Sequence, residues 1–373
     1  MPWRQSHAPT EKEVYLLDRK LHSVKLDFKN VKLSGRENEI KTLREVYNRS
    51  ILRRTNVKQP KEVVFVYGYS GVGKSALVET LRAEGAMMVA GKFDQKIRSA
   101  PFSAIVEALS ELCDYILAYD SDDLSALRAN FKEKFVKRKQ QLFAVCNLVP
   151  KISEVMGVEE EVRKHYYTGT SAGTRSGAFT NLKEGCQLFL QVACDKNDRG
   201  NFILFIDDLQ WGDVASIDLI KDISTDPSIN GMLFVGAYRV NEVDSVHPLA
   251  IQLRQMEGQG SVNNIQLNVG DLDVVSVKKI IADAMHSTSM EPLKDLSILV
   301  HRKTGGNAFF VIQFLRALQK DGLLYYSMES FAWMWDTAII QKETSMNENV
   351  VDFMASKIRQ LVRSRHFPFR RFN

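Results

Sequence analysis

Residues 61–75 read K-E-V-V-F-V-Y-G-Y-S-G-V-G-K-S, and this stretch decides the fold. Its first part, 61–67, is a run of β-branched and aromatic residues that predicts a buried strand ending at Gly68. From Gly68 to Ser75 every fixed position of the pattern G-x-x-x-x-G-K-[S/T] is matched, and a helical pattern continues to about Ala83. Such a loop binds phosphate when a strand precedes it and a helix follows it, so the sequence predicts a phosphate site here.

The residue types in this loop suit a bound triphosphate. Glycines allow the backbone to curl until successive N–H groups converge on phosphate oxygens, and the N-terminus of the following helix adds its positive end. The Lys74 ammonium can reach the β- and γ-phosphates, and the Ser75 hydroxyl can ligate Mg²⁺. With ATP or ADP and Mg²⁺ as the expected cofactors, the predicted nucleotide contacts are Gly68, Tyr69, Ser70, Gly71, Val72, Gly73, Lys74, Ser75 and Ala76.

Two other glycine motifs fit the same stretch less well. Gly71-x-Gly73-x-x-Ala76, with an acidic residue further on at Asp94, resembles the dinucleotide-binding fingerprint. That fingerprint accounts for neither the lysine nor the serine that follow Gly73, and it puts the tight turn too far from the end of the strand. The G-x-S-x-G elbow of hydrolases is excluded because Val72 stands where its last glycine belongs.

The run F-I-L-F-I-D-D at 202–208 places two carboxylates at the end of an otherwise apolar strand. Mg²⁺ on a triphosphate needs a further carboxylate from a neighbouring strand, and we predict that Asp207 supplies it through water. Asp208, one residue beyond the strand, is suited to accept a proton from the attacking water as a general base. Two acids so close repel each other unless a cation lies between them. Alternatively, one of them caps the helix that begins near Gly212, although Asp213 is better placed for that role.

A basic residue ends the next predicted strand, 232–239. Arg239 is expected to emerge at the same edge of the sheet, where a guanidinium can stabilise charge on the γ-phosphate. Together with Lys74 and Asp208, Arg239 completes the residues that we predict to be catalytic. An ordinary surface arginine in a loop is the alternative.

Strands and helices alternate from residue 36 to about 270, which predicts an α/β fold with a parallel sheet covered by helices. A segment at about 121–178 interrupts the alternation, and it ends in a Gly/Ser/Thr tract. We interpret this segment as an insertion in the sheet domain.

The C-terminal part of the chain changes character. From residue 271 onward the pattern is helical, with a hairpin at 322–336 and a last helix at 348–363. The expected domains are an N-terminal segment at 1–30, a phosphate-loop core at 31–270 and a smaller helical lid domain at 271–373.

Composition excludes several classes of protein. At 373 residues, 45% of them hydrophobic and 25% charged, the chain is typical of a globular protein with two or three domains. It has neither an apolar run of the roughly 20 residues that a membrane helix needs nor a signal-peptide core, so we expect an intracellular, cytoplasmic location and no membrane partner. The four cysteines form no C-x-x-C pair and the seven histidines no H-x-x-x-H pair, which disfavours a zinc site and favours buried, reduced thiols. A net charge of +5 is too small by itself to predict nucleic-acid binding.

Several segments carry a resemblance to the STAND class of signal-transduction ATPases, within the AAA+ superfamily of P-loop NTPases, and to origin-recognition-like AAA ATPase domains. The phosphate loop is similar to Walker A, D-D-L-Q-W at 207–211 is similar to Walker B, and Arg239 falls where the family has its sensor arginine. Residues 33–37, L-S-G-R-E, resemble the G-R-E motif that opens these domains. Residues 304–310, T-G-G-N-A-F-F, resemble the G-G-N-P-F-F segment of the helical lid.

The resemblance implies a cycle. In such proteins the loop at Gly35 and Arg36 lies against the adenine, ADP is held between core and lid at rest, ATP exchange opens them, and hydrolysis resets the switch. It also implies protein partners or self-association. In the lid segment Ala308 replaces the family's proline, and an ordinary helix start capped by Asn307 is the alternative explanation.

The leading hypothesis is an ATP-binding and ATP-hydrolysing molecular switch of signal transduction. The alternative is a DNA-binding, replication-initiator-like AAA+ ATPase, since the same family includes replication initiators. It depends on the basic C-terminal end at 363–373 and on basic residues of the insertion, for which a solvated helix face is the ordinary explanation. Those insertion residues are Lys132, Lys134, Lys137, Arg138 and Lys139. A small-molecule kinase is disfavoured because the helical lid and the Asp208 base suit attack by water.

Overall fold

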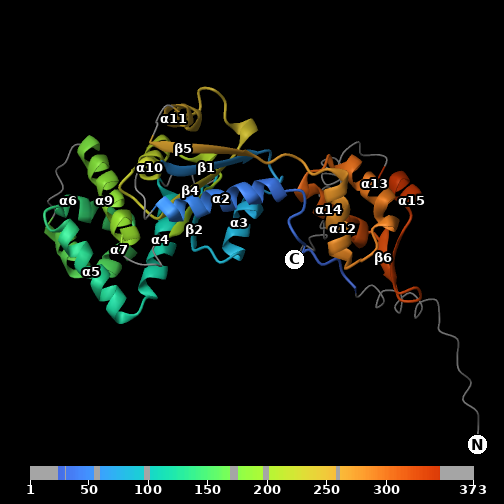
Figure 1. Cartoon of the computed structure of the whole chain (residues 1–373), viewed down its shortest axis with the longest axis horizontal. Coiled ribbons are helices and arrows are strands. Elements are labelled where there is room, and N and C mark those ends of the chain that lie inside the picture. Colours follow the sequence, from blue (N-terminus) through green and yellow to red (C-terminus); the bar gives the residue numbers. More distant parts are fainter. Residues whose placement is uncertain are drawn as a thin grey trace, which may run out of the picture. The chain divides into compact units, whose positions relative to one another are not determined.

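Five parallel strands form the central sheet in the computed structural model, within a unit that comprises Glu37–Gly270 (Figure 1). Their order across the sheet is β2-β3-β4-β1-β5, so β4 lies between the strand that leads into the phosphate loop and the strand that ends in the two aspartates. The strands are β1 (Lys61–Gly68), β2 (Met88–Lys92), β3 (Phe202–Asp207), β4 (Met232–Arg239) and β5 (Val262–Asn268). The predicted α/β class with a parallel sheet is confirmed.

The structure describes residues 24–29, 31–53, 59–95, 101–168, 175–195, 201–257 and 261–344. Within these ranges no helix has the length and apolar character needed to cross a membrane. Part of the Gly/Ser/Thr tract of the insertion lies outside the described residues. So do residues 1–23, the helix expected at 348–363 and the basic end at 363–373.

Apolar, β-branched sequences form these strands because a parallel sheet is covered on both faces. All residues of β3 are buried, and β1 is buried along nearly its whole length. In register, Val64 of β1 lies beside Val235 of β4 on one side and Ile265 of β5 on the other.

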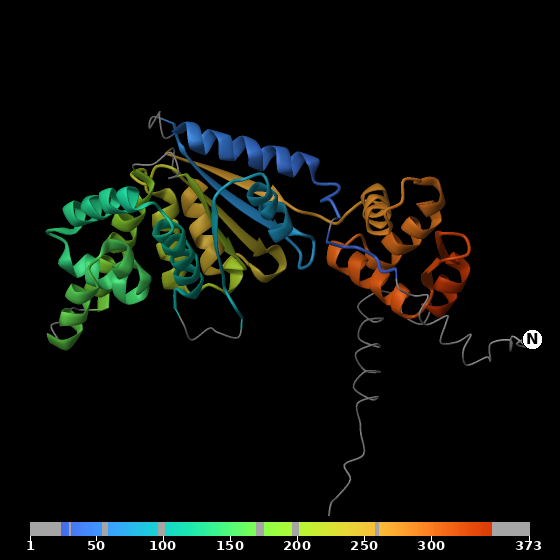
Figure 2. The same cartoon turned by 90° about the horizontal axis from the view of Figure 1, so that it is seen from below.

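Helices cover both faces of the sheet. Alternate residues of β3, namely Phe202, Leu204 and Ile206, share one apolar core with helices α4, α10 and α11, so these helices lie on the same face. Helices α2 and α3 pack against each other and against β1 and β4, and Figure 2 shows α2 on the side of the sheet away from α4. The bounds are α2 (Glu37–Arg53), α3 (Lys74–Ala83), α4 (Ser103–Leu117), α10 (Val214–Thr225) and α11 (Pro248–Glu257).

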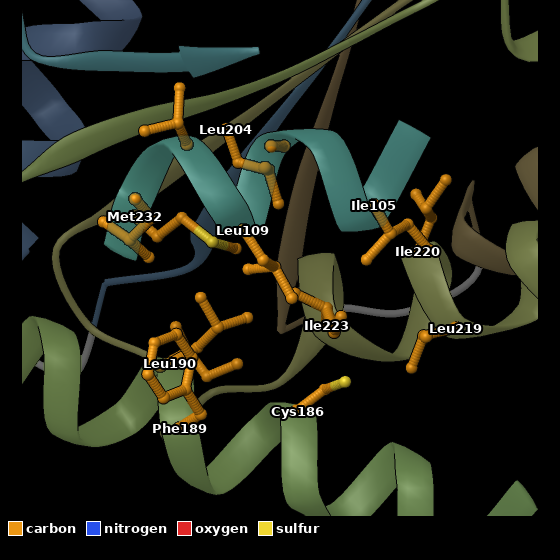
Figure 3. Close-up of a cluster of buried hydrophobic side chains, with 14 of the residues drawn as sticks. Ile105, Leu109, Cys186, Phe189, Leu190, Leu204, Leu219, Ile220, Ile223 and Met232 are labelled. Carbon is orange, nitrogen blue, oxygen red and sulfur yellow. The ribbon is translucent and has the colours of Figure 1, made fainter. Parts of the chain in front are cut away.

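The apolar core beneath α4 is packed with aliphatic side chains. Figure 3 shows Leu109 of α4 beside Met232 of β4 and Ile223 of α10, and Ile105 of α4 beside Ile220 of α10. Leu109 has no exposed surface. This packing fixes α4 against the strands whose ends carry the candidate site.

The described residues between α4 and β3, which include those of the expected insertion, are mostly helical. The longest of these helices, α9, packs along α5 and α6, and the rings of Phe131 in α5 and Phe189 in α9 stack with centroids 5.3 Å apart. The helices are α5 (Ser121–Phe135), α6 (Lys139–Leu148), α7 (Lys151–Met156), α8 (Glu159–Thr168) and α9 (Arg175–Asp195).

The second unit consists of the described residues up to Arg36 and those from Asp271 onward. Strands β6 (Leu324–Ser327) and β7 (Ala332–Trp335) pair as the antiparallel hairpin that the sequence predicts. The helical elements of this unit are α12 (Val274–Met285), η3 (Glu291–Leu293), α13 (Lys294–Thr304), α14 (Ala308–Lys320) and α15 (Thr337–Glu343).

The N-terminal stretch belongs to this second unit. Leu26 lies in its apolar core, Asp27 N donates to Ala284 O at 2.9 Å, and Lys32 N donates to Asp283 Oδ2 at 3.2 Å. We expected residues 31–36 in the phosphate-loop core; these contacts with α12 group them with the helical unit instead.

The four cysteines are buried free thiols, as the sequence predicts. Burial raises the pKa of Cys113, Cys146 and Cys186 to about 12. These side chains therefore remain protonated at neutral pH and pack as small apolar groups.

The buried core leads to a stability prediction. Leu109→Ala is expected to lower the free energy of unfolding by about 2–5 kcal/mol, because it leaves a cavity in a closed core. Chemical denaturation followed by circular dichroism measures the change. Leu52→Ala on α2, where the residue is 60% exposed, is the matched control and should change stability by less than about 0.5 kcal/mol. Equal losses in the two variants would contradict this description of the core.

Candidate functional site

The phosphate loop runs from the end of β1 into α3, and two of its glycines are required by geometry. A Cβ on Gly68 would lie 2.2 Å from Val269 O, so only glycine allows the loop to pass this close to the end of β5. Gly73, which precedes α3, has a φ of 101°, a conformation that L-residues with side chains rarely adopt. The loop backbone is thereby curled as phosphate binding requires.

The side chains of the loop divide into buried and exposed groups. Val72 and Lys74 are buried, whereas Tyr69, Ser70 and Ala76 are exposed. The Lys74 ammonium donates to Gly68 O at 3.1 Å and to Tyr69 O at 2.8 Å, which holds it over the loop. Burial lowers the pKa of Lys74, and the negative charges of Asp207 and Asp208 oppose that shift.

Asp207 lies within hydrogen-bonding distance of the loop helix. Its Oδ2 accepts from Ser75 Oγ at 2.8 Å, and its Oδ1 accepts from Asp208 N at 2.8 Å. We expected this carboxylate on a strand adjacent to β1, and that detail was wrong, because β4 separates β1 from β3. The contact forms nevertheless because Ser75 lies in the first turn of α3 rather than on the strand.

Asp208 is buried and surrounded by donors. Its Oδ1 accepts from Gln210 Nε2 at 2.8 Å and lies 3.3 Å from Arg239 Nε, and its Oδ2 lies 2.9 Å from Lys92 Nζ. Burial alone would raise the pKa of Asp208, but hydrogen bonds from Lys92 and Gln210 and the charges of Lys92 and Arg239 hold it below its ordinary value. Asp208 is therefore ionised and oriented. Its φ of 54° is left-handed, a conformation that aspartate and asparagine tolerate better than most residues.

Arg239 joins the same cluster from the end of β4. Its Nη1 donates to Glu242 Oε1 at 2.9 Å, and its guanidinium lies over the Trp211 ring, 4.4 Å from the centroid. Trp211 Nε1 in turn donates to Glu242 Oε2 at 2.8 Å, and Arg239 N donates to Gln210 Oε1 at 3.0 Å. Trp211 lies in the 3₁₀ turn η1 (Leu209–Trp211) and Glu242 in η2 (Val240–Glu242). Arg239 is thus fixed by several contacts, unlike an arginine in an ordinary loop.

The structure brings together Lys74, Ser75, Asp207, Asp208 and Arg239 at the carboxyl edge of the sheet. It adds two residues that the sequence reasoning missed, Lys92 at the end of β2 and Glu242 after β4. Polar residues at the carboxyl ends of parallel strands are candidates for a binding site. Both residues stand at or just after such a strand end, so the sequence could have indicated each of them.

Other predicted residues belong to the helical unit. Gly35 and Arg36 belong to the helical unit, where a Cβ on Gly35 would lie 2.2 Å from Ser276 Oγ, and Arg36 is buried. Asn307 caps α14 by accepting from Phe310 N at 3.3 Å, as the alternative explanation of the lid segment expects. The nucleotide contacts of Gly35 and Arg36 stay a prediction.

Asp213 takes the capping role that the sequence favours for it. Its Oδ1 accepts from Ser216 N at 3.0 Å at the start of α10. Asp207 and Asp208 are therefore not needed as caps of that helix.

The basic residues considered for DNA binding lie around the junction of α5 and α6. Lys139 pairs with Glu161 at 2.5 Å, and Arg138 Nη1 donates to Lys134 O at 2.9 Å. Part of this charge is thus neutralised within the insertion, and DNA binding stays a prediction.

The residues at the sheet edge fit a magnesium nucleotide. Ser75 Oγ and the Asp207 carboxylate are the hard oxygen ligands that Mg²⁺ prefers, and they lie side by side. A Cβ on Gly73 would meet no atom within 4 Å, so the space beside this glycine is open, and Lys74 Nζ lies 2.8 Å from Tyr69 O.

Comparisons with known proteins show the family to which the chain belongs. The family described as the AAA ATPase domain matches residues 32–235. Hybrid signal transduction histidine kinase G of Dictyostelium discoideum is 27% identical over 375 residues, covering 82% of this chain and 10% of that protein. Peroxide stress-activated histidine kinase mak3 of Schizosaccharomyces pombe is 34% identical over 96 residues, covering 25% of this chain and 4% of that protein. A Walker-type ATPase of Pyrococcus abyssi aligns at 12% identity with a TM-score of 0.46, over 92% of this chain and 80% of that one.

The family match spans more than half of the sequence, so the chain belongs to the AAA ATPase domain family. This is the class of P-loop ATPase that the sequence motifs indicate. The chain spans a tenth or less of the length of the two histidine kinases it matches.

The dependence of stability on acidic pH tests whether Asp208 is charged in the folded protein. Its pKa is lowered in the folded protein, so the ionised carboxylate stabilises the fold above the ordinary aspartate pKa of about 3.9. That contribution is lost as the pH falls through the lower, folded-state pKa. We expect the free energy of unfolding, from denaturation at a series of pH values, to fall more steeply with acid in the wild type than in Asp208→Asn.

The control for this measurement is Asp122→Asn, at an exposed position in the first turn of α5. It should follow the wild-type curve. Parallel acid curves for the wild type and Asp208→Asn would show that Asp208 carries no such stabilising charge.

Proposed function

We propose that the chain is an ATP-binding and ATP-hydrolysing regulatory switch of the STAND type. The observation that carries this proposal is the meeting of Ser75 Oγ with Asp207 Oδ2 at 2.8 Å, beside an ionised Asp208. The carboxylate next to the phosphate-loop serine would bind the metal, and the second carboxylate would accept a proton from the attacking water. One strand end thus supplies both parts of a hydrolysing site.

The loop and the start of α3 would bind the phosphates of the nucleotide. The N–H groups of the loop and the N-terminus of α3 would bind phosphate oxygens, and Lys74 would supply a positive charge. Ser75 and Asp207 would hold Mg²⁺, which when bound would neutralise negative charge on the phosphates.

Asp208 and Arg239 would carry out the hydrolysis step. The water oxygen forms a bond to the γ-phosphorus as the bond to the β–γ bridging oxygen breaks, and Asp208 accepts the water proton. Arg239, 3.3 Å from that carboxylate, can turn its guanidinium toward the γ-phosphate charge.

A regulatory role is supported by the relatives. The Dictyostelium protein is described as a signal transduction histidine kinase, and its similar segment is about a tenth of its length. An ATPase module inside a longer signalling protein would act on other parts of that protein or on partner proteins. We infer that nucleotide state, rather than turnover itself, is the output of this module.

Two substitutions separate binding from hydrolysis. Lys74→Ala is expected to weaken ATP binding by about tenfold or more, because a buried cation over the loop is lost. Asp208→Asn should keep ATP binding but lower single-turnover hydrolysis by about 10²–10⁴-fold, because it removes the base while preserving shape and backbone conformation. Fluorescence titration and phosphate release measure the two properties.

The matched control is Lys134→Ala, an exposed lysine on α5, which should change neither property. Unchanged hydrolysis in both Lys74→Ala and Asp208→Asn would overturn the proposed function.

A further inference from the structure

Lys92 is the last residue of β2, and β2 is the direct neighbour of β3 in the sheet. In register, Lys92 lies beside Asp207. Its ammonium lies 3.4 Å from Asp207 Oδ2 and 2.9 Å from Asp208 Oδ2, so one cation bridges the two acids. Two adjacent carboxylates require such a cation, and the chain supplies it.

The two sides of this contact differ in burial. The Lys92 side chain is 58% exposed, whereas those of Asp207 and Asp208 are only 12% and 5% exposed. The carboxylates are therefore fixed, and the ammonium reaches them on a flexible stem from solvent. The pair joins a partly exposed ammonium to two buried carboxylates, so we expect loss of the ammonium to change the charge at the site.

One oxygen of Asp207 faces both the Lys92 ammonium and Ser75, the expected metal ligand. Asp207 Oδ2 accepts from Ser75 Oγ, the expected Mg²⁺ ligand, and also faces Lys92 Nζ. Two cations at one carboxylate oxygen repel each other, so a bound divalent ion and the ammonium compete there. The stem of Lys92 is free to rotate outward, which makes that competition reversible.

Charged groups of both signs meet in the cluster. Asp207, Asp208 and Glu242 face Lys74, Lys92 and Arg239. A further carboxylate, that of Glu107, accepts from Lys92 N at 2.9 Å. Loss of Lys92 would leave the cluster with an excess negative charge close to where the anionic phosphates of a nucleotide bind. That excess would be relieved by a divalent cation.

We propose that Lys92 is a positioning residue that supplies, at the Asp207–Asp208 pair, the positive charge otherwise supplied by a divalent cation, and so lets the site hold nucleotide without Mg²⁺. This inference rests on the proposed nucleotide site. Removing Lys92 weakens metal-free nucleotide binding, because the carboxylates then repel the phosphates. It also strengthens Mg²⁺ binding, because the competing cation is gone. Both effects increase the dependence of nucleotide affinity on Mg²⁺.

The test is a fluorescence titration of the full chain with N-methylanthraniloyl-ADP, in excess EDTA and in excess MgCl₂. The quantity measured is the ratio of Kd in EDTA to Kd in MgCl₂. We expect Lys92→Met to raise this ratio by about tenfold or more over the wild type, since one unit charge close to the phosphates is lost. Lys92→Arg, which keeps the charge, should restore a ratio close to that of the wild type.

Lys137→Met removes a lysine from the exposed turn between α5 and α6 and is the matched control. Its ratio should equal that of the wild type. Thermal melts establish that each variant is folded, and Lys92→Gln replaces Lys92→Met if the latter aggregates, with the same expected ratio. A merely structural role for Lys92 would change both Kd values alike and leave the ratio unchanged.

The outcomes separate this inference from the proposed function. If the wild type binds the probe but Lys92→Met leaves the ratio unchanged, the role of Lys92 is wrong and the nucleotide site stands. If neither protein binds the probe with or without Mg²⁺, the proposed function itself fails. A raised ratio in both Lys92→Met and Lys92→Arg would also overturn the inference, because charge would then not be the cause.

Discussion

Two adjacent carboxylates at the end of a fully buried strand are the constraint on which the rest of the site depends. A strand such as β3 can carry Asp207 and Asp208 only where donors and cations meet them, because an unpaired buried charge is costly. The donors come from the first turn of α3, from the ends of β2 and β4, and from the turn after β3. Parallel topology makes this possible, since it brings all these carboxyl ends to one edge of the sheet.

The glycine loop depends on the same edge. Gly68 passes so close to the carbonyl of Val269 that any side chain would collide with backbone, and Val269 N donates to Tyr67 O at 2.7 Å. The end of β5 thus shapes the loop from one side. From the other side, Asp207 contacts Ser75 across the width of β4. The loop is therefore held between two strands that the chain reaches only after the insertion, and its geometry is a property of the assembled sheet.

Local patterns in the sequence predicted much of this fold. The strands, the phosphate loop, the Asp213 cap and the hairpin at 322–336 were predicted from runs of residues whose structure is set by near neighbours. The order of the strands could not be predicted in this way, because the sequence of one strand does not show which other strand pairs with it. Our placement of Asp207 on a strand adjacent to β1 failed for that reason. The position of Lys92 at the end of a strand marked it as a candidate, but its contact with the two aspartates follows only from the pairing of β2 with β3.

The central claim is that the loop at 68–75 holds the phosphates of a nucleotide while Ser75 and Asp207 face its metal. A crystal structure of the full chain grown with ADP and Mg²⁺ tests this most directly. The account predicts phosphate oxygens within about 3 Å of the loop N–H groups and of Lys74 Nζ, with Mg²⁺ about 2.1 Å from Ser75 Oγ. Nucleotide bound elsewhere on the chain, with the loop contacting no phosphate, would contradict it.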